Sequence, residues 1–239
     1  MLTGYTAIAM PGNEECSTTG ATTCTITGLT SATCIVITVV AHTTVGDSGM
    51  SAPTCVTPGS GVTFTSNPDD RVAFGSAFRF TVTTTGSPVP AISKTGKLPP
   101  GTHFKKGTNG TATISGTPDG SASGIYLLTL TAKNKLATAR QTFTLTITRP
   151  PAIKRIPSRT VTTGSTLNLP VTSVGYPIPA LTESGSLPAG VTFTDYGNGS
   201  AALLGTPSPG SQASYRITIT ATNTYGTTSR TFTLKVTAP

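Results

Sequence analysis

The residues that could perform acid–base chemistry are few and far apart. The chain has two histidines, His42 and His103. Its eight acids are Glu14, Glu15, Asp47, Asp69, Asp70, Asp119, Glu183 and Asp195. Hydrolysis needs a nucleophile, a base and an orienting carboxylate that converge, and no serine here stands in a Gly-x-Ser-x-Gly turn. The sequence therefore predicts no enzyme, although a Ser-His-Asp arrangement stays open at this stage.

Groups that could bind a metal are also sparse. Asn67, Asp69, Asp70 and Asp119 could offer oxygens to calcium, since hard cations take carboxylate and carbonyl ligands. The net charge of +8 opposes a cation site, and we interpret Asp69-Asp70 as a turn. Zinc would need cysteines and histidines at closer spacing than His42 provides. We expect no metal and no cofactor.

Four cysteines, Cys16, Cys24, Cys34 and Cys55, lie in the first 55 residues. An even number in one short region favours disulfides and an oxidising compartment. More than one pairing is open to four cysteines, and spacing and strand order favour Cys16–Cys24 with Cys34–Cys55. Met1 is not followed by a basic and then apolar signal peptide. The expected extracellular or cell-surface location therefore rests on the cysteines, and whether residues precede Met1 is left open.

Surfaces for ligands are limited. With no Trp, six Tyr and eight Phe, the chain has few aromatic platforms for sugars. Tyr176, Tyr196 and Tyr225 occupy expected loop positions and are the candidates for ligand contact. The basic residues form small scattered groups, such as Lys105/Lys106, which suit a soluble surface or anionic glycans. We expect cell-surface polysaccharide as one partner. We expect no nucleic acid, because basic and aromatic residues are not interleaved, and no membrane insertion, because no apolar run approaches the length of a membrane span.

The chain contains one module twice. With an offset of 89, residues 71–150 align with 160–239 without a gap, and 32 of 80 pairs are identical. Turn motifs repeat, among them Leu98-Pro99-Pro100-Gly101 and Gly116-Thr117-Pro118. Chemistry-bearing residues do not, since His103 corresponds to Thr192. What is repeated is scaffold, and a fixed period of this kind decides the fold.

Alternation of apolar residues with threonine predicts strands. Thr supplies 52 of the 239 residues, and Gly and Pro together supply 45, which suits strands separated by turns. Phe143, Leu145 and Ile147 point to one face, with threonines between them. Asn109-Gly110 and Asn198-Gly199 are hairpin signals. The pattern predicts an all-β chain of tandem sandwiches with about seven short strands each and no helix.

The ordered motifs F-x-F-x-V, G-x-P-x-P, L-P-x-G-x-x-F, G-T-P and Y-x-L-T-x-T-A-x-N over residues 62–239 resemble the bacterial He-PIG ("putative immunoglobulin") family. The resemblance implies cadherin- or Ig-like sandwiches, which occur as tandem repeats in surface proteins. We expect an N-terminal unit at 1–57 and two Ig-like repeats at 58–150 and 151–239. The joint Arg149-Pro150-Pro151 should act as a stiff spacer, so that the modules form a linear rod.

The N-terminal unit resembles the second half of a fibronectin type III domain in its segments 4–6, 24–30 and 35–41. The first two strands of such a sandwich are absent. We therefore expect exposed inner faces at Ile26, Ile35, Ile37 and Val39, beside an unpaired edge. Strands from another copy, or from another surface protein, would cover them by β-augmentation.

These observations favour a non-catalytic extracellular structural or adhesive protein, such as a fibre (filament) subunit or a surface stalk. A glycan-binding accessory region of a secreted enzyme is the alternative. A virion-surface protein of a phage is a further alternative, which would explain Met1 without a signal peptide.

Overall fold

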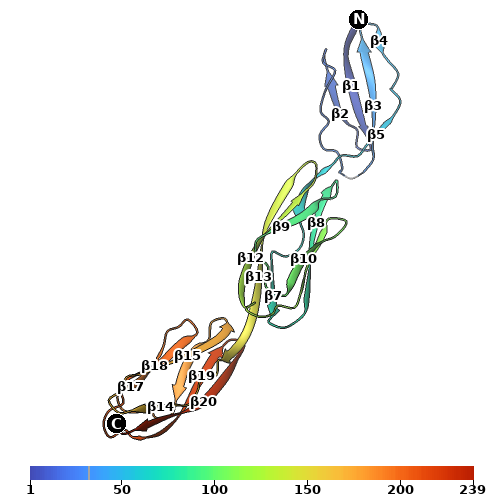
Figure 1. Ribbon diagram of the computed structural model, residues 1–239. Helices are drawn as coiled ribbons and strands as arrows, with labels where there is room; N and C mark the ends of the chain where they lie inside the picture. The colour runs from blue at the N-terminus through green and yellow to red at the C-terminus, as the bar shows by residue number, and fades with distance from the viewer. Residues whose placement is uncertain (32) are drawn as a thin grey trace.

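The computed structural model describes residues 1–31 and 33–239 and shows three bodies that follow one another from the N-terminus to the C-terminus (Figure 1). Every regular element in the described residues is a β-strand. The all-β prediction is confirmed, and its cause is the Thr-rich alternation that fits a pleated, half-buried strand.

The N-terminal body is a single five-stranded sheet. Its strands are β1 (Leu2–Met10), β2 (Glu14–Thr18), β3 (Ile35–Thr43), β4 (Gly46–Asp47) and β5 (Thr54–Val56). The order is β2-β1-β3-β4, and β5 also pairs with β3. In the described part of the chain β2 pairs on one side only, with β1, so its other edge is free. Residues 24–30 form no strand.

The middle body is a sandwich of two sheets. One sheet has the order β10-β11-β8-β6, made of β6 (Ser60–Phe64), β8 (Phe78–Ser87), β10 (Thr102–Lys106) and β11 (Thr111–Gly116). The other contains β7 (Asp69–Ala73), β9 (Ala91–Thr95), β12 (Gly124–Lys133) and the first part of β13 (Thr138–Ile153). β7 runs parallel to β13, and the remaining pairs are antiparallel.

The C-terminal body repeats this topology. Its strands are β14 (Arg159–Thr162), β15 (Leu167–Tyr176), β16 (Ala180–Ser184), β17 (Val191–Asp195), β18 (Ser200–Gly205), β19 (Ala213–Asn223) and β20 (Gly226–Thr237). One sheet has the order β17-β18-β15-β13 and the other β14-β20-β19-β16. β14 is parallel to β20, as β7 is to β13.

The cores lie where the alternation places them. Phe143, Leu145 and Ile147 are fully buried in the middle body. Phe232, Leu234 and Val236 are at most 4% exposed in the C-terminal body. Tyr126 and Tyr215 pack against the two cores from their margins, and the hydroxyl of Tyr215 donates to the carbonyl of Ser211 at 2.8 Å.

One strand belongs to both sandwiches. β13 is 16 residues long, pairs with β7 and β12 in the middle body, and then pairs with β15 in the C-terminal body. Pro150 and Pro151 lie inside this strand rather than in a separate linker. The ladder shifts register between Arg149 and Ala152, as expected where prolines supply no N–H. The middle body therefore continues into the C-terminal body without a break in the extended chain.

A repeated asparagine fastens the incoming strand of each sandwich. Asn134 Nδ2 donates to the carbonyls of Ser60 and Pro88 at 3.1 and 2.9 Å. Asn223, at the same repeat position, donates to the carbonyls of Arg149 and Pro177 at 3.0 and 2.8 Å. We call these two residues the latch asparagines.

Glycine is required opposite each latch. At Gly175 an added Cβ would lie 2.8 Å from Pro179 Cγ and 3.1 Å from Asn223 Nδ2. Gly86 has φ +156 and faces Pro90 and Asn134 in the same way. The repeated Gly-x-Pro-x-Pro motif is therefore the counterpart of the latch asparagine.

Two local expectations can be compared with the turns. Asn109-Gly110 does connect a hairpin, β10 to β11, and both residues have positive φ. Asp69 and Asp70, however, begin strand β7 rather than form a turn. The interpretation as a turn was wrong because pairing with β13 extends the strand as far as Asp69.

Candidate functional site

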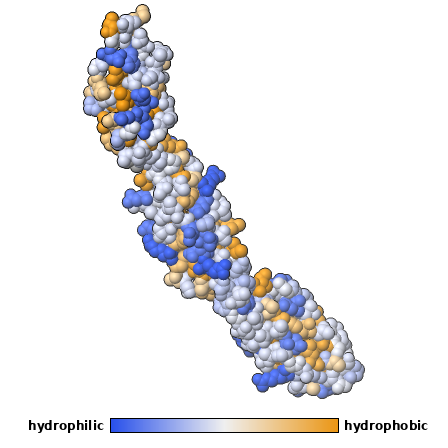
Figure 2. Space-filling model, turned by 180° about the vertical axis from the view of Figure 1, so that it is seen from behind, coloured by the Kyte–Doolittle hydropathy of each residue, from blue (hydrophilic) through white to orange (hydrophobic). Residues whose placement is uncertain are grey.

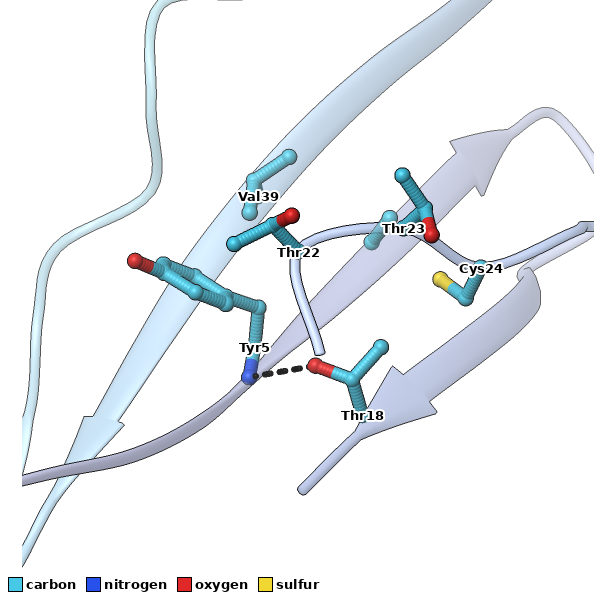
Figure 3. A pocket seen from close by; sticks show the side chains of 7 residues that line it. Tyr5, Thr18, Thr22, Thr23, Cys24 and Val39 are labelled. Atoms are coloured by element: carbon cyan, nitrogen blue, oxygen red, sulfur yellow. Dashed lines mark hydrogen bonds between the residues drawn. The ribbon is translucent and has the colours of Figure 1, made fainter. Parts of the chain in front are cut away.

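A groove of about 560 Å³ lies on one face of the N-terminal sheet. Its lining residues are Tyr5, Ala7, Thr18, Thr22, Thr23, Cys24 and Val39. Three adjacent strands supply the floor, because Ala7 pairs with Val39 and Tyr5 pairs with Thr18. Paired residues point to the same face of a sheet. Figure 3 shows the chain at Thr22 and Thr23 rising beside this floor.

Disulfides hold the edges of this body. Cys16 pairs with Ala7 and so lies on the groove face. Its disulfide with Cys24 ties the following segment back over the sheet, with a Cα–Cα distance of 6.0 Å. A second disulfide joins Cys34, just before β3, to Cys55 on β5. These are the two pairs that spacing and strand order favour.

The groove is equipped for binding. Its seven lining side chains present a phenol ring, threonine hydroxyls, apolar groups and a disulfide, with no carboxylate or amine among them. Thr18 Oγ1 accepts a hydrogen bond from the backbone N–H of Tyr5 at 3.3 Å, drawn as the dashed line in Figure 3. A ring and hydroxyls over an apolar floor can hold a partly apolar surface, but they offer no acid–base pair.

The face that carries the groove is better covered than the sequence predicts. Ile35 is 2% exposed, so the expectation that it lies uncovered is wrong. Ile26, Ile37 and Val39 are half-buried. Leu29, in the same segment as Ile26, is also half-buried, although residues 24–30 form no strand. Within residues 1–31 and 33–239, β2 pairs with β1 alone, so the sheet has the unpaired edge that the sequence predicts.

A histidine and a carboxylate do meet on the opposite face of this sheet. His42 Nδ1 lies 2.7 Å from Asp47 Oδ1, and His42 Nε2 lies 2.7 Å from Thr6 Oγ1. Thr6 Oγ1 is also 2.8 Å from Ser17 Oγ. A carboxylate, an imidazole and a hydroxyl group in this order have the arrangement of a catalytic triad.

The surroundings of this network do not resemble an active site. The side chains of His42 and Asp47 are 34% and 62% exposed, and none of the network residues lines the grooves of about 560, 400, 300 and 200 Å³ in the described part of the chain. A reaction site needs a concave pocket that positions substrate and excludes water. We interpret the network as exposed pairing across neighbouring strands, because His42 faces Asp47 and Thr6 faces Ser17 in the ladders.

The other groups considered for chemistry stay apart. His103 Nε2 lies 3.2 Å from Ser115 Oγ in the middle body, in a different body from His42. Over residues 1–31 and 33–239, no three His, Cys, Asp or Glu side chains come close enough together to hold a metal.

The candidate tyrosines do not form one surface. Tyr176 and Tyr225 meet at the joint between the middle and C-terminal bodies, where they line a cavity of about 200 Å³ with Pro177, Arg71 and Ile125 among their neighbours. Arg71 Nη1 donates to the hydroxyl of Tyr225 at 2.9 Å. Tyr196 lies outside this cavity, in the β17–β18 hairpin. Ligand contact by the three tyrosines stays a prediction.

Sequence reasoning missed Tyr5 as a groove residue. The signal is the alternation of Tyr5, Ala7 and Ala9, which places them on one face of a strand. Only the pairing of β1 with β3 shows that this face meets Val39.

The comparisons with known proteins agree with this architecture. The titin fragment A168169 matches with a TM-score of 0.61 and 13% identity, covering 74% of this chain and 98% of that one. The I-band fragment I67-I69 from titin matches with a TM-score of 0.59 and 14% identity, covering 98% of this chain and 88% of that one. The titin Ig tandem domains A164-A165 match with a TM-score of 0.54 and 16% identity, covering 76% and 100%. At these identities the likeness shows the fold, a tandem array of Ig-like sandwiches. No curated protein matches the chain.

The family model He_PIG, described as "Putative Ig domain", matches residues 44–148 and again 150–237. Both matches contain the repeated turn motifs, the two sandwiches and the latch asparagines. The chain therefore belongs to this Ig-like domain family and carries two tandem copies of its domain.

Proposed function

We propose that the chain is a non-catalytic extracellular structural protein, a stalk or fibre subunit that keeps contact surfaces at a fixed separation. The observation that carries this proposal is β13, a single strand that belongs to the sheets of two successive sandwiches. Bending at this joint would break hydrogen bonds between β13 and its partner strands in one of the two sandwiches. A shared strand therefore resists bending more than a free linker does.

Side-chain contacts brace the same joint. The latch residue Asn223 holds the carbonyl of Arg149, and Arg71 of the middle body donates to Tyr225 of the C-terminal body. The guanidinium of Arg149 also lies over the ring of Phe74, 4.1 Å from its centroid, at a distance suited to cation–π attraction. Together these contacts favour one relative orientation of the two sandwiches.

Two features support an extracellular location. The N-terminal body is closed by two disulfides, which persist in oxidising environments. The Ig-like family is consistent with exposed stalks. Among the described residues, no helix has the length and apolarity needed to cross a membrane.

The N-terminal body is the proposed contact end. It combines the free edge of β2 with the open groove lined by Tyr5 and Thr22. A strand of a second copy would add to the β2 edge and lay apolar side chains into the groove, which is recognition by β-augmentation. Self-association of this kind would turn the spacer into a fibre.

Native mass spectrometry with negative-stain imaging of the oxidised chain tests the proposal. We expect elongated particles with a constant angle at the β13 joint, and oligomers that join through the N-terminal body. Thr22→Lys should abolish the oligomers, because Thr22 is exposed and lines the groove. Val45→Lys is the control, since Val45 is 93% exposed outside the groove.

Three results would count against parts of the proposal. Particles that bend freely at Arg149–Pro151 would refute the spacer. A chain that stays monomeric, or oligomers that resist Thr22→Lys, would refute self-association through this body while leaving the spacer standing.

A further inference from the structure

The middle body carries most of the positive charge of the chain. Residues 58–150 contain ten Lys and Arg against three acids, a net charge of +7, whereas residues 1–57 contain three acids and no Lys or Arg. Figure 2 shows strongly hydrophilic side chains, in blue, on all three bodies, and since this colour marks acids and amides as well as cations, the sign of the charge comes from the sequence. Anionic partners are therefore attracted to the middle body first.

Part of this charge surrounds a concave site. A groove of about 400 Å³ is lined by Arg79, His103, Lys105, Lys106, Gly107, Thr108, Thr111, Thr113 and Ser115. The three charged side chains come from β8 and β10 and are all exposed. None of the nine residues is acidic, and the sole ion pair in the described residues is that of His42 with Asp47 in the N-terminal body. The cationic groups thus have no carboxylate partner within the described part of the chain.

Strand pairing sets the spacing of these groups. Arg79, Ser115 and His103 form one row across β8, β11 and β10, which separates the outer two by about 10 Å at the usual distance between strands. Lys105 lies two residues beyond His103 on the same face, about 7 Å along β10. The Ser115 hydroxyl group lies in the row between Arg79 and His103, and Thr113 pairs with Lys105. Arg79 and Lys105, with an imidazole and hydroxyl groups beside them, can therefore contact successive negative charges along a linear chain.

The scaffold does not require these residues. At the same positions the C-terminal copy has Asn168 for Arg79, Thr192 for His103 and Thr194 for Lys105, on strands with the same pairing. The sister sandwich is built equally well without the charges, so packing does not explain them.

We propose that the groove on the β8–β11–β10 face binds an anionic polysaccharide through its carboxylate, sulfate or phosphate groups. Nucleic acid is the competing polyanion, and the groove lacks the aromatic side chains on which single-stranded bases stack. This site is separate from the β13 joint and from the groove of the N-terminal body. Failure of the polysaccharide proposal would therefore leave the proposed function untouched, and the reverse also holds.

The test uses the full chain with residues borrowed from its own second copy. The groove variant is Arg79→Asn with His103→Thr and Lys105→Thr. The matched control is Lys133→Thr with Lys135→Thr. Like the groove variant, it removes two positive charges from the middle body and installs the residues of the second copy, but both positions lie outside the groove. Titration calorimetry would use polygalacturonate, dextran sulfate and phosphorylated dextran, with neutral dextran and single-stranded DNA as comparisons.

We expect at least one of the three anionic polymers to bind and neutral dextran not to bind. The groove variant should bind roughly four- to ninefold more weakly, since each of the two lost charge contacts contributes roughly a factor of two to three. The control should change affinity by less than about twofold, and raising the salt should weaken wild-type binding. The polymer that binds most tightly identifies the anionic group that the groove prefers.

Several outcomes would overturn the site. Equal losses in the groove variant and the control would show a general effect of net charge. Binding of DNA alone would replace a polysaccharide with a nucleic acid. A change in native mass with unchanged polymer affinity would make the groove a contact between copies. No binding of any polymer at low salt would leave the groove without the proposed ligand.

Discussion

The latch asparagine gives the sharpest prediction about what holds each sandwich together. Asn134 is 9% exposed and makes four hydrogen bonds. It donates to the carbonyls of Ser60 and Pro88, and its Oδ1 accepts from the N–H groups of Leu136 and Ala137 at 2.9 and 2.8 Å. Each bond contributes about 1 kcal/mol net, so Asn134→Ala should lower the free energy of unfolding of the middle body by about 3–4 kcal/mol. For a domain of this size the corresponding fall in Tm is about 15 °C or more.

Differential scanning calorimetry and urea unfolding of the oxidised chain would measure this loss. Asn134→Asp keeps the acceptor but places a carboxylate against two carbonyl oxygens, so it should be at least as unstable as Asn134→Ala. Asn67→Ala, at an exposed asparagine, should change stability by less than about 0.5 kcal/mol. If Asn134→Ala cost no more than Asn67→Ala, the latch would contribute nothing and the reasoning would be refuted.

Three further perturbations follow from burial and pairing. Leu145→Ala should lower the free energy of unfolding, measured in urea, by about 2–5 kcal/mol, because it opens a cavity in the core. Leu127→Ala, at a side chain 62% exposed, should be nearly neutral. Equal losses for the two variants would contradict the assignment of Leu145 to the buried face. Replacing Cys34 and Cys55 by serine should destabilise the N-terminal body by about 3 kcal/mol, because the bond closes a loop with a sequence separation of 21. The fall should appear in hydrogen exchange of residues 35–43 and not in the two sandwiches; a global fall would show that the bodies unfold together. Thr6→Val should cost about 1 kcal/mol of stability and leave any esterase activity of the preparation unchanged, whereas loss of a measurable activity would make the His42 network catalytic.

The fold was predictable because its signals are local and occur twice. Residues 143–147 alternate so regularly that the alternation alone assigns the buried face, and the repeat fixed the number of sandwiches. The continuity of β13 was not predictable, since Pro150-Pro151 is typical of a linker. Extension of the strand through two prolines depends on pairing with β15, about 25 residues further along the chain.

The functional surfaces depend on contacts between distant residues. Arg79 and His103 are 24 positions apart in the sequence and become neighbours only through β11, so the basic residues appeared scattered. The difference between the two copies at these positions was the available signal. Ile35 was predicted to be exposed because a sandwich without its first two strands should leave this face open, and the local sequence carries no signal of the tertiary contacts that bury it.

The central claim, that the sandwiches hold a fixed separation through their shared strand, is tested most directly by one distance distribution. Spin labels at Ser93→Cys and Thr182→Cys occupy equivalent exposed positions on β9 and β16, and pulsed electron resonance of the oxidised chain measures the distance between them. We predict one narrow peak at the separation set by the β13 joint. A broad distribution extending to short distances would show that the joint is a hinge and would contradict the account.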